Sequence, residues 1–286
     1  MLENEDVREP PAVGGVIPDS FGFSEIFRRV LATAREELDR PTKLLFWSGL
    51  AAGLSLGLTF FARATLTGLA GTGDPGLVGN LLYPVGFIII VLGKYQLFTE
   101  NTLTPVALVL TRMARPINLL RLWVTVLVAN MIGATAIAAM FSLTSVKEPS
   151  AADAALAMGK HALEVGVGAL FWRAVIAGWI VATMVWLVHA VTDTLSRILV
   201  VSVLMYFIGV SDLFHVVTGT VEVLYVVFEG EASFWSIWHE FVVPVLAGNV
   251  IGGIVFVAIL NTAQFGHEEG GELVARLQRG ELDHPE

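Results

Sequence analysis

The side chains best suited to chemistry in this sequence lie inside long apolar segments. His215 is the single histidine of one such segment, and an unperturbed histidine, with a pKa of about 6.5, can hold or release a proton near neutral pH. Lys94, Glu100 and Thr99 lie in another apolar segment, where ionisable residues are functional candidates because charge is costly there. These residues predict a buried polar site that handles a charge or a proton.

Each of these residues also has a structural interpretation. His215 could be hydrogen-bonded only to hold a loop, and Lys94 and Glu100 could form an ion pair that braces the chain. If Glu100 is unpaired and ionised, it repels anions, and a cationic or neutral solute becomes the better hypothesis.

Other classes of site lack a sequence signal. There is no cysteine, no paired-histidine metal spacing, no phosphate-binding loop, no nucleophile–base arrangement and no basic face for nucleic acid. We therefore expect no enzyme activity, no cofactor, no metal and no nucleic-acid partner.

The composition is that of an integral membrane protein. Hydrophobic residues make up 55% of the 286 residues and charged residues only 15%, and the apolar residues gather in runs long enough to cross a bilayer as helix. We expect an all-α chain with six spans in an inner membrane. The six predicted segments are 44–61, 77–110, 122–143, 163–189, 198–228 and 241–260.

Two of these segments are too long for one simple span, and each has a polar interruption. Segment 77–110 contains the polar stretch 99–105, which ends at Pro105, and segment 198–228 contains Asp212 just before His215. Non-helical backbone at membrane depth is tolerated only where protein buries it or where it lines a water-filled cavity. Both breaks are therefore predicted to line one pore, with Asn101, Asp212 and Thr218 bracing them.

The basic residues predict the orientation. They gather before the first span, in the even-numbered loops and after the last span, so both termini are expected on the cytoplasmic side. Residues 1–43 are interpreted as a cytoplasmic segment with an amphipathic helix at 24–38 capped by Ser24, residues 44–262 as the channel domain, and residues 263–286 as an acidic cytoplasmic tail. The basic residues are Arg28, Arg29, Arg35, Arg40, Lys43, Arg112, Arg115, Arg121, Arg197, Arg276 and Arg279.

The chain carries an internal repeat. Three short matches keep their order: 46–53 with 171–178, 97–99 with 213–215, and 128–134 with 247–253. Each half then holds three spans, an odd number, so the halves are predicted to lie in opposite orientations as inverted repeats with a shared site near the midplane. Asn130 and Asn249 are interpreted as structural hydrogen-bonding residues, and Gly248 and Gly252 as a small-residue face for close helix packing.

These features resemble the formate/nitrite transporter family over roughly residues 40–262. The anchors are 97–99 in the broken second segment, His215 in the broken fifth, and 244–253 in the sixth. The resemblance implies an aquaporin-like protomer in a homopentamer, with one pore per subunit, that passes small monovalent weak-acid anions such as formate, nitrite or hydrosulfide. It also implies an apolar constriction at Phe87, Phe98 and either Ile208 or Phe207.

In this interpretation the anion takes a proton from His215 and crosses the constriction as a neutral acid, which avoids the cost of bare charge in the bilayer. A facilitator of a neutral or cationic solute and a non-conducting assembly remain as alternatives. The chain also departs from the family pattern, because Glu100 stands where a small residue is usual, and Gly219 and Gly178 replace asparagines.

Overall fold

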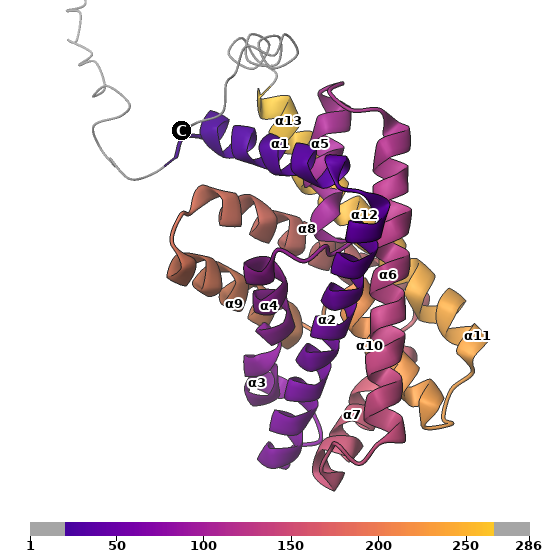
Figure 1. The fold of residues 1–286 in the computed structure, drawn as a ribbon. Helices are drawn as coiled ribbons and strands as arrows, with labels where there is room; N and C mark the ends of the chain where they lie inside the picture. The colour runs from indigo at the N-terminus through magenta and orange to yellow at the C-terminus, as the bar shows by residue number, and fades with distance from the viewer. Residues whose placement is uncertain (1–20, 266–286) are drawn as a thin grey trace, which may run out of the picture.

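The computed structural model describes residues 21–265, and within that range every regular element is helical (Figure 1). The predicted acidic tail, beyond its first three residues, lies outside the described residues. Five helical stretches are long and apolar enough to cross a membrane, which agrees with an all-α multi-pass chain. They are Thr42–Ala70, Gly76–Gly93, Pro116–Leu143, Val167–Ala190 and Phe234–Phe265.

The helices follow one another with short connections. The elements before residue 145 are α1 (Phe23–Asp39), α2 (Thr42–Ala70), α3 (Gly76–Gly79), η1 (Asn80–Leu82), α4 (Val85–Gly93), η2 (Glu100–Thr102), α5 (Thr104–Leu110) and α6 (Pro116–Leu143). The later elements are α7 (Pro149–Glu164), α8 (Val167–Ala190), α9 (Thr194–Val210), α10 (Val216–Phe228), α11 (Phe234–Ile237), η3 (Trp238–Val242), α12 (Val243–Gly253), η4 (Ile254–Ile259) and α13 (Leu260–Phe265).

Both predicted breaks are present. α4 ends at Gly93, and the next residue, Lys94, turns the chain out of the helix with a φ of 52°. Apart from the short helix η2, the backbone is then irregular until α5 starts at Thr104, with Pro105 in its first turn. α9 ends before Asp212, with a φ of 51°, and α10 starts after His215. A left-handed residue ends a helix because the next carbonyls can no longer align with its hydrogen-bond ladder.

Two helices cap the bundle at opposite ends (Figure 1). α1 packs against α5, α8 and α13, and its buried residues Phe27, Val30, Leu31, Ala34 and Leu38 follow one helical face, as the amphipathic pattern predicted. α7 packs against α2 and α10 at the other end. The side chain of Ser24 makes no capping hydrogen bond, and the N-cap is Gly22, so that detail of the prediction was wrong.

Several predicted segments were too short, and one helix was not predicted: the third segment starts at Pro116 and not at residue 122, and the sixth covers Phe234–Phe265 and not 241–260. The first span was predicted to end at residue 61, whereas α2 continues to Ala70 and carries Arg63 into the bundle. The helix α7 was not predicted, because its buried face consists largely of alanines, which give a weak apolar signal.

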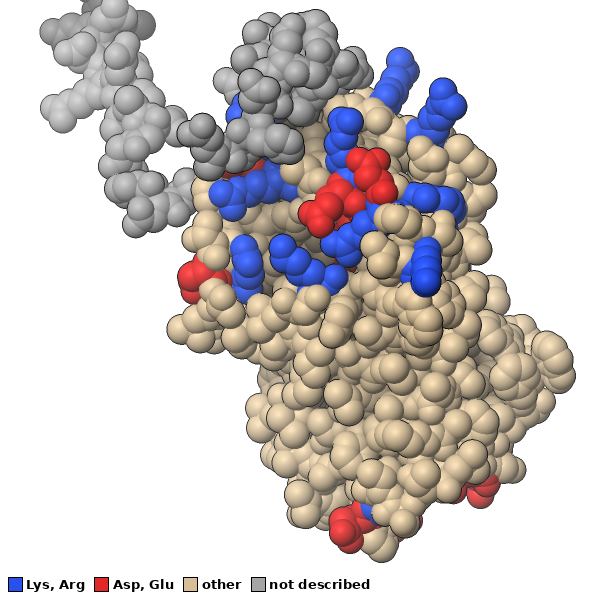
Figure 2. Space-filling view, viewed as in Figure 1, with Lys and Arg blue, Asp and Glu red and all other residues tan. Residues whose placement is uncertain are grey.

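Charge separates along the long axis of the molecule. On the face drawn in Figure 2, Lys and Arg gather at the end that α1 covers, the opposite end shows mainly Asp and Glu, and a broad band between them carries neither. A band without charged side chains is the surface that a hydrocarbon layer requires.

Candidate functional site

The two breaks meet at a hydrogen bond between their polar side chains. His215 Nε2 lies 2.6 Å from Thr99 Oγ1, and both residues are almost fully buried. His215 Nδ1 accepts a hydrogen bond from the backbone N–H of Thr218 at 3.3 Å. Because a backbone N–H can only donate, the neutral imidazole carries its proton on Nε2 and donates it to Thr99. The hydroxyl hydrogen of Thr99 is then free to point elsewhere.

Apolar side chains surround this hydrogen bond. The ring of Phe87 stands edge-on to the imidazole of His215, with centroids 5.1 Å apart, and stacks against Tyr83 at 5.8 Å. Phe98 is buried against Trp123. Of the two alternatives at the fifth segment, Ile208 is fully buried, whereas Phe207 exposes half of its surface.

Asn130 holds the first break in place. Its Oδ1 accepts from the backbone N–H of Phe98 at 2.9 Å, and its Nδ2 donates to the carbonyls of Gly49 and Gln96 at 2.7 and 3.0 Å. The irregular backbone around Phe98 therefore satisfies its polar groups through a buried side chain instead of through a helix ladder.

Asn249 makes the corresponding contacts at the second break. Its Oδ1 accepts from the backbone N–H of Val216 at 2.8 Å, and its Nδ2 donates to the carbonyls of Ala174 and Phe214 at 2.8 and 2.9 Å. Asn130 and Asn249 each hydrogen-bond three backbone groups, two at a break and one in a long helix. These are the contacts that the structural interpretation of both residues predicts.

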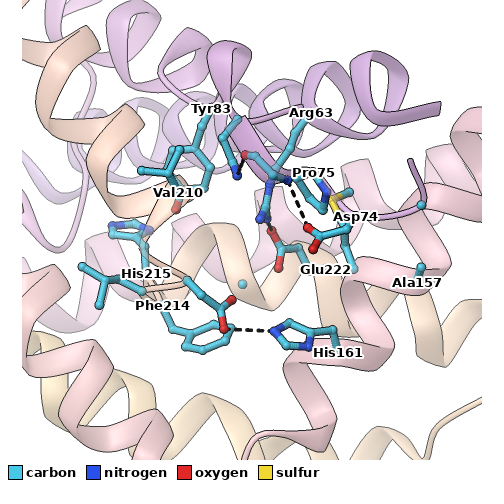
Figure 3. A pocket seen from close by; sticks show the side chains of 18 residues that line it. Arg63, Asp74, Pro75, Tyr83, Ala157, His161, Val210, Phe214, His215 and Glu222 are labelled. Atoms are coloured by element: carbon cyan, nitrogen blue, oxygen red, sulfur yellow. Dashed lines mark hydrogen bonds and ion pairs between the residues drawn. The ribbon is translucent and has the colours of Figure 1, made fainter. Parts of the chain in front are cut away.

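A cavity of about 400 Å³ opens on the His215 side of the breaks (Figure 3). We name it the Glu222 cavity, after the buried carboxylate of α10 that lines it with His215, Tyr83, Asn80 and Arg63. Figure 3 shows Arg63 and Glu222 pointing toward one another across the cavity, and Arg63 Nη1 lies 2.8 Å from Glu222 Oε1.

Asp212 lies at the rim of the same cavity and is held by two side chains. His161 Nε2 lies 2.9 Å from its Oδ2, and Arg173 also pairs with that oxygen. Asp212 therefore ties α7 and α8 to the end of α9.

A second cavity, of about 280 Å³, lies on the α1 side and shares no lining residue with the first. We name it the Glu100 cavity. Lys94 and Glu100 both line it, but the described residues contain no ion pair between them, and Glu100 Oε1 is buried without a hydrogen-bond partner. Its other charged side chains are Arg29, Glu36, Glu37, Arg40 and Arg197.

Glu37 connects α1 to the first break. Its carboxylate accepts from Thr104 Oγ1 at 2.6 Å and from Gln96 Nε2 at 3.4 Å, and Gln96 Oε1 accepts in turn from Asn101 Nδ2 at 3.2 Å. The position of α1 is therefore linked by hydrogen bonds to the polar stretch that contains Thr99.

Several residues of these cavities were missed in the sequence. Arg63 lies just beyond the predicted first segment, 44–61, although it belongs to α2, and the sequence patterns linked neither Glu222 nor Glu37 to a site. A signal existed for Arg63 and Glu222, since an ionisable residue within an apolar run marks a functional candidate. Glu37 had no such signal, because a charged residue on an amphipathic helix is ordinary.

The two glycines that depart from the family pattern lie where a side chain would collide with its neighbours. A Cβ at Gly219 would meet the ring of Phe241, and a Cβ at Gly178 would meet the backbone of Asn249. Neighbouring atoms already fill the space that a side chain would need at both positions, so an asparagine at either would require its neighbours to move.

Comparisons with known proteins agree with this architecture. The formate/nitrite transporter family model matches residues 24–263. The inner membrane protein YfdC of Escherichia coli (strain K12) is 36% identical over 259 residues, which cover 89% of this chain and 82% of that protein. The formate channel FocA of Haemophilus influenzae is 27% identical, over 79% of this chain and 88% of that protein.

Solved structures have the same fold. A channel described as an FNT family ion channel superposes with a TM-score of 0.75 at 17% identity, covering 84% of this chain and 99% of that one. A pentameric formate channel with formate bound superposes with a TM-score of 0.66 at 19% identity, covering 82% and 98%. The apolar helices, the two breaks that meet at Thr99 and His215, and the family match over most of its length assign this chain to the formate/nitrite transporter family, whose members are membrane transport proteins.

Proposed function

We propose that this protein conducts small monovalent weak-acid anions, and that each anion crosses the constriction as its neutral acid. The observation that carries the proposal is the 2.6 Å contact between Thr99 and His215, which stands at the closed region between two polar cavities. The family match and the relative described as a formate channel support formate-like substrates.

The chemistry follows from the cost of moving charge. A bare anion in the apolar region between the cavities loses several kcal/mol of hydration, by an amount that depends on local water. We infer that the anion takes a proton from the water of one cavity, passes Phe87 and Ile208 as an uncharged molecule, and releases the proton to the water on the far side. Transport is then coupled to one proton.

We assign to His215 and Thr99 the role of hydrogen-bond donors. The sequence-based hypothesis of direct transfer from His215 requires an imidazolium, which carries a proton on Nδ1. That proton would break the contact with the backbone N–H of Thr218, so the geometry favours a neutral imidazole. Donation from Nε2 polarises the Thr99 hydroxyl, whose own hydrogen can then be donated to the passing solute.

We further infer six spans in two inverted repeats, assembled as a homopentamer with one pore per subunit in a bacterial inner membrane. The matching contacts of Asn130 and Asn249 support the repeat. The structural neighbour described as pentameric supports the assembly, and the relative described as an inner membrane protein supports the location. The cytoplasmic side is assigned to the basic end in Figure 2.

One observation favours a cationic or neutral solute as a second candidate. Glu37 and Glu100 are acidic groups of the Glu100 cavity, and Lys94 forms no ion pair with Glu100 among the described residues. If both carboxyls are ionised they attract cations, so the transport assay below includes methylammonium as a test solute.

The test is uptake into proteoliposomes of formate, nitrite, hydrosulfide, acetate and methylammonium at several pH values. The wild type should take up the weak acids faster as the pH falls. His215→Ala and Thr99→Val should lower that uptake about tenfold or more, since a lost hydrogen bond in the transition state is worth about 1.4 kcal/mol or more. Thr99→Ser keeps the hydroxyl and is the matched control.

Two outcomes of this assay would contradict the proposal. If the correctly assembled wild type takes up no weak acid at any pH, the anion proposal fails, and uptake of methylammonium alone would establish the second candidate. If Thr99→Val transports as well as Thr99→Ser, the hydroxyl has no part in conduction.

A further inference from the structure

A largely buried arginine side chain of α2 lines the Glu222 cavity. The side chain of Arg63 exposes 12% of its surface and that of Glu222 exposes 6%, and both line the cavity that reaches His215. The guanidinium also lies 5.6 Å above the ring of Tyr83, which stacks on Phe87 beside His215.

The ion pair uses only part of what Arg63 offers. A guanidinium carries five N–H donors arranged in a planar fork. Among the described residues, Arg63 donates one hydrogen bond, from Nη1 to Glu222 Oε1, and its Nε has no partner. The pair is therefore not the closed, two-bond pair that a purely structural arginine and carboxylate tend to form.

Two further acidic side chains line this cavity, and each has its own partners. Asp74 accepts a hydrogen bond from the backbone N–H of Gly76 at 3.0 Å, and Asp212 lies at the rim. Asp212 is held by Arg173 and His161, so it does not compete for Arg63. Asn80, which is almost fully buried in the lining, leaves its Oδ1 without a partner. The cavity thus contains a guanidinium with N–H donors that have no acceptor and an amide oxygen, Asn80 Oδ1, that has no donor, and His215 lines the same cavity.

We propose that Arg63 is an anion-binding site for planar anions with two oxygens, and that Glu222 is a built-in counter-ion that such an anion displaces or shares. This inference rests on the proposed function and adds a selectivity to it. A carboxylate or nitrite can receive two parallel N–H bonds from a guanidinium edge, whereas hydrosulfide has a single acceptor atom. Arg63 then favours the two-oxygen anions over hydrosulfide.

Substitutions of Glu222 and of Arg63 should change the half-saturation concentration for formate and nitrite in opposite directions. Glu222→Gln keeps an acceptor of the same shape but removes the competing charge, so the half-saturation concentration for formate and nitrite should fall several-fold, to roughly a fifth. Arg63→Lys keeps the charge and the pairing with Glu222 but loses the fork, so the half-saturation concentration for both should rise about tenfold. Hydrosulfide should change less than about twofold in Arg63→Lys.

The control is Lys160→Gln. Lys160 pairs with Glu231 at the exposed outer surface, so this variant removes one positive charge near the same end without touching the cavity lining. All variants are compared in the proteoliposome assay as full chains, after size-exclusion chromatography shows that each assembles like the wild type.

Two results would overturn the inference. One is a Glu222→Gln variant with an unchanged or higher half-saturation concentration for formate and nitrite. The other is an Arg63→Lys variant that alters formate, nitrite and hydrosulfide by the same factor, or no more than Lys160→Gln does. If Arg63→Lys fails to assemble, Glu222→Gln alone decides. A wild type without any weak-acid uptake contradicts the proposed function itself, whereas normal wild-type uptake with unaffected variants contradicts only the role of Arg63.

Discussion

Glu37 is a buried acid on a helix that lies outside the membrane-spanning segments. Burial raises the pKa of Glu37 from its usual value of 4.5 to about 7, against the lowering effect of the hydrogen bonds from Thr104 and Gln96 and of the nearby charge of Arg40. Its carboxyl is therefore protonated in the folded chain at pH values where the unfolded chain has already lost the proton.

The stability of the α1 contact should depend on pH as a consequence. The folded-state pKa is raised, so the contribution is fully present below about pH 4.5 and is lost as the pH rises through about 7. Between those values the wild type should lose on the order of 3 kcal/mol relative to Glu37→Gln, which does not titrate. Thermal unfolding in detergent at pH 4.5, 6 and 8 measures this, and parallel pH profiles for the two proteins would contradict it.

At the scale of elements, α8 and α12 pack so closely that glycine is required. A Cβ at Gly252 would meet the carbonyl oxygen of Val175, and one at Gly248 would meet that of Phe171, so the predicted small-residue face is confirmed. Gly168, in the first turn of α8, has open space where a Cβ would stand.

The two kinds of glycine should respond oppositely to alanine. Gly252→Ala should destabilise the protein by about 1–3 kcal/mol, because a methyl group is forced against rigid backbone. Gly168→Ala should be neutral or stabilising by up to about 1 kcal/mol, because alanine is the better helix former. Thermal unfolding in detergent compares them, and equal effects would mean that the helices can separate without cost.

At the scale of the whole molecule, the chain offers a direct test of its orientation because it contains no cysteine. Ser233 lies between α10 and α11, and Ser196 lies in the first turn of α9, toward the other side of the bundle in the proposed topology. With both termini cytoplasmic, a membrane-impermeant maleimide added to intact spheroplasts should label Ser233→Cys and leave Ser196→Cys at background until the cells are lysed. The reverse pattern would invert the orientation.

The sequence by itself determined the class of the protein and the identity of its central pair. Long apolar runs require helices in a bilayer, and polar residues inside two of those runs require breaks in the helices. These rules depend on local composition alone, so Thr99 and His215 could be assigned to the breaks without knowledge of the fold. Their roles in conduction remain predictions.

The contacts of Asn130 and Asn249 relate the two breaks by a different offset from that of the sequence match. The sequence match aligned 97–99 with 213–215 at an offset of 116. The asparagine contacts instead pair Phe98 with Val216, at an offset of 216 − 98 = 118. Three-residue matches cannot determine register, because backbone hydrogen bonds and not side-chain identity define which positions are equivalent.

Only the tertiary structure decided which charged groups meet. Arg63 and Glu222 are 159 positions apart in the chain, and Glu37 and Thr104 are 67 apart. Such pairs are set by how α1, α2, α5 and α10 pack, which depends on shape complementarity across many small residues and has no local signature. The same packing left Lys94 and Glu100 without an ion pair among the described residues, although they lie only a few positions apart in the sequence.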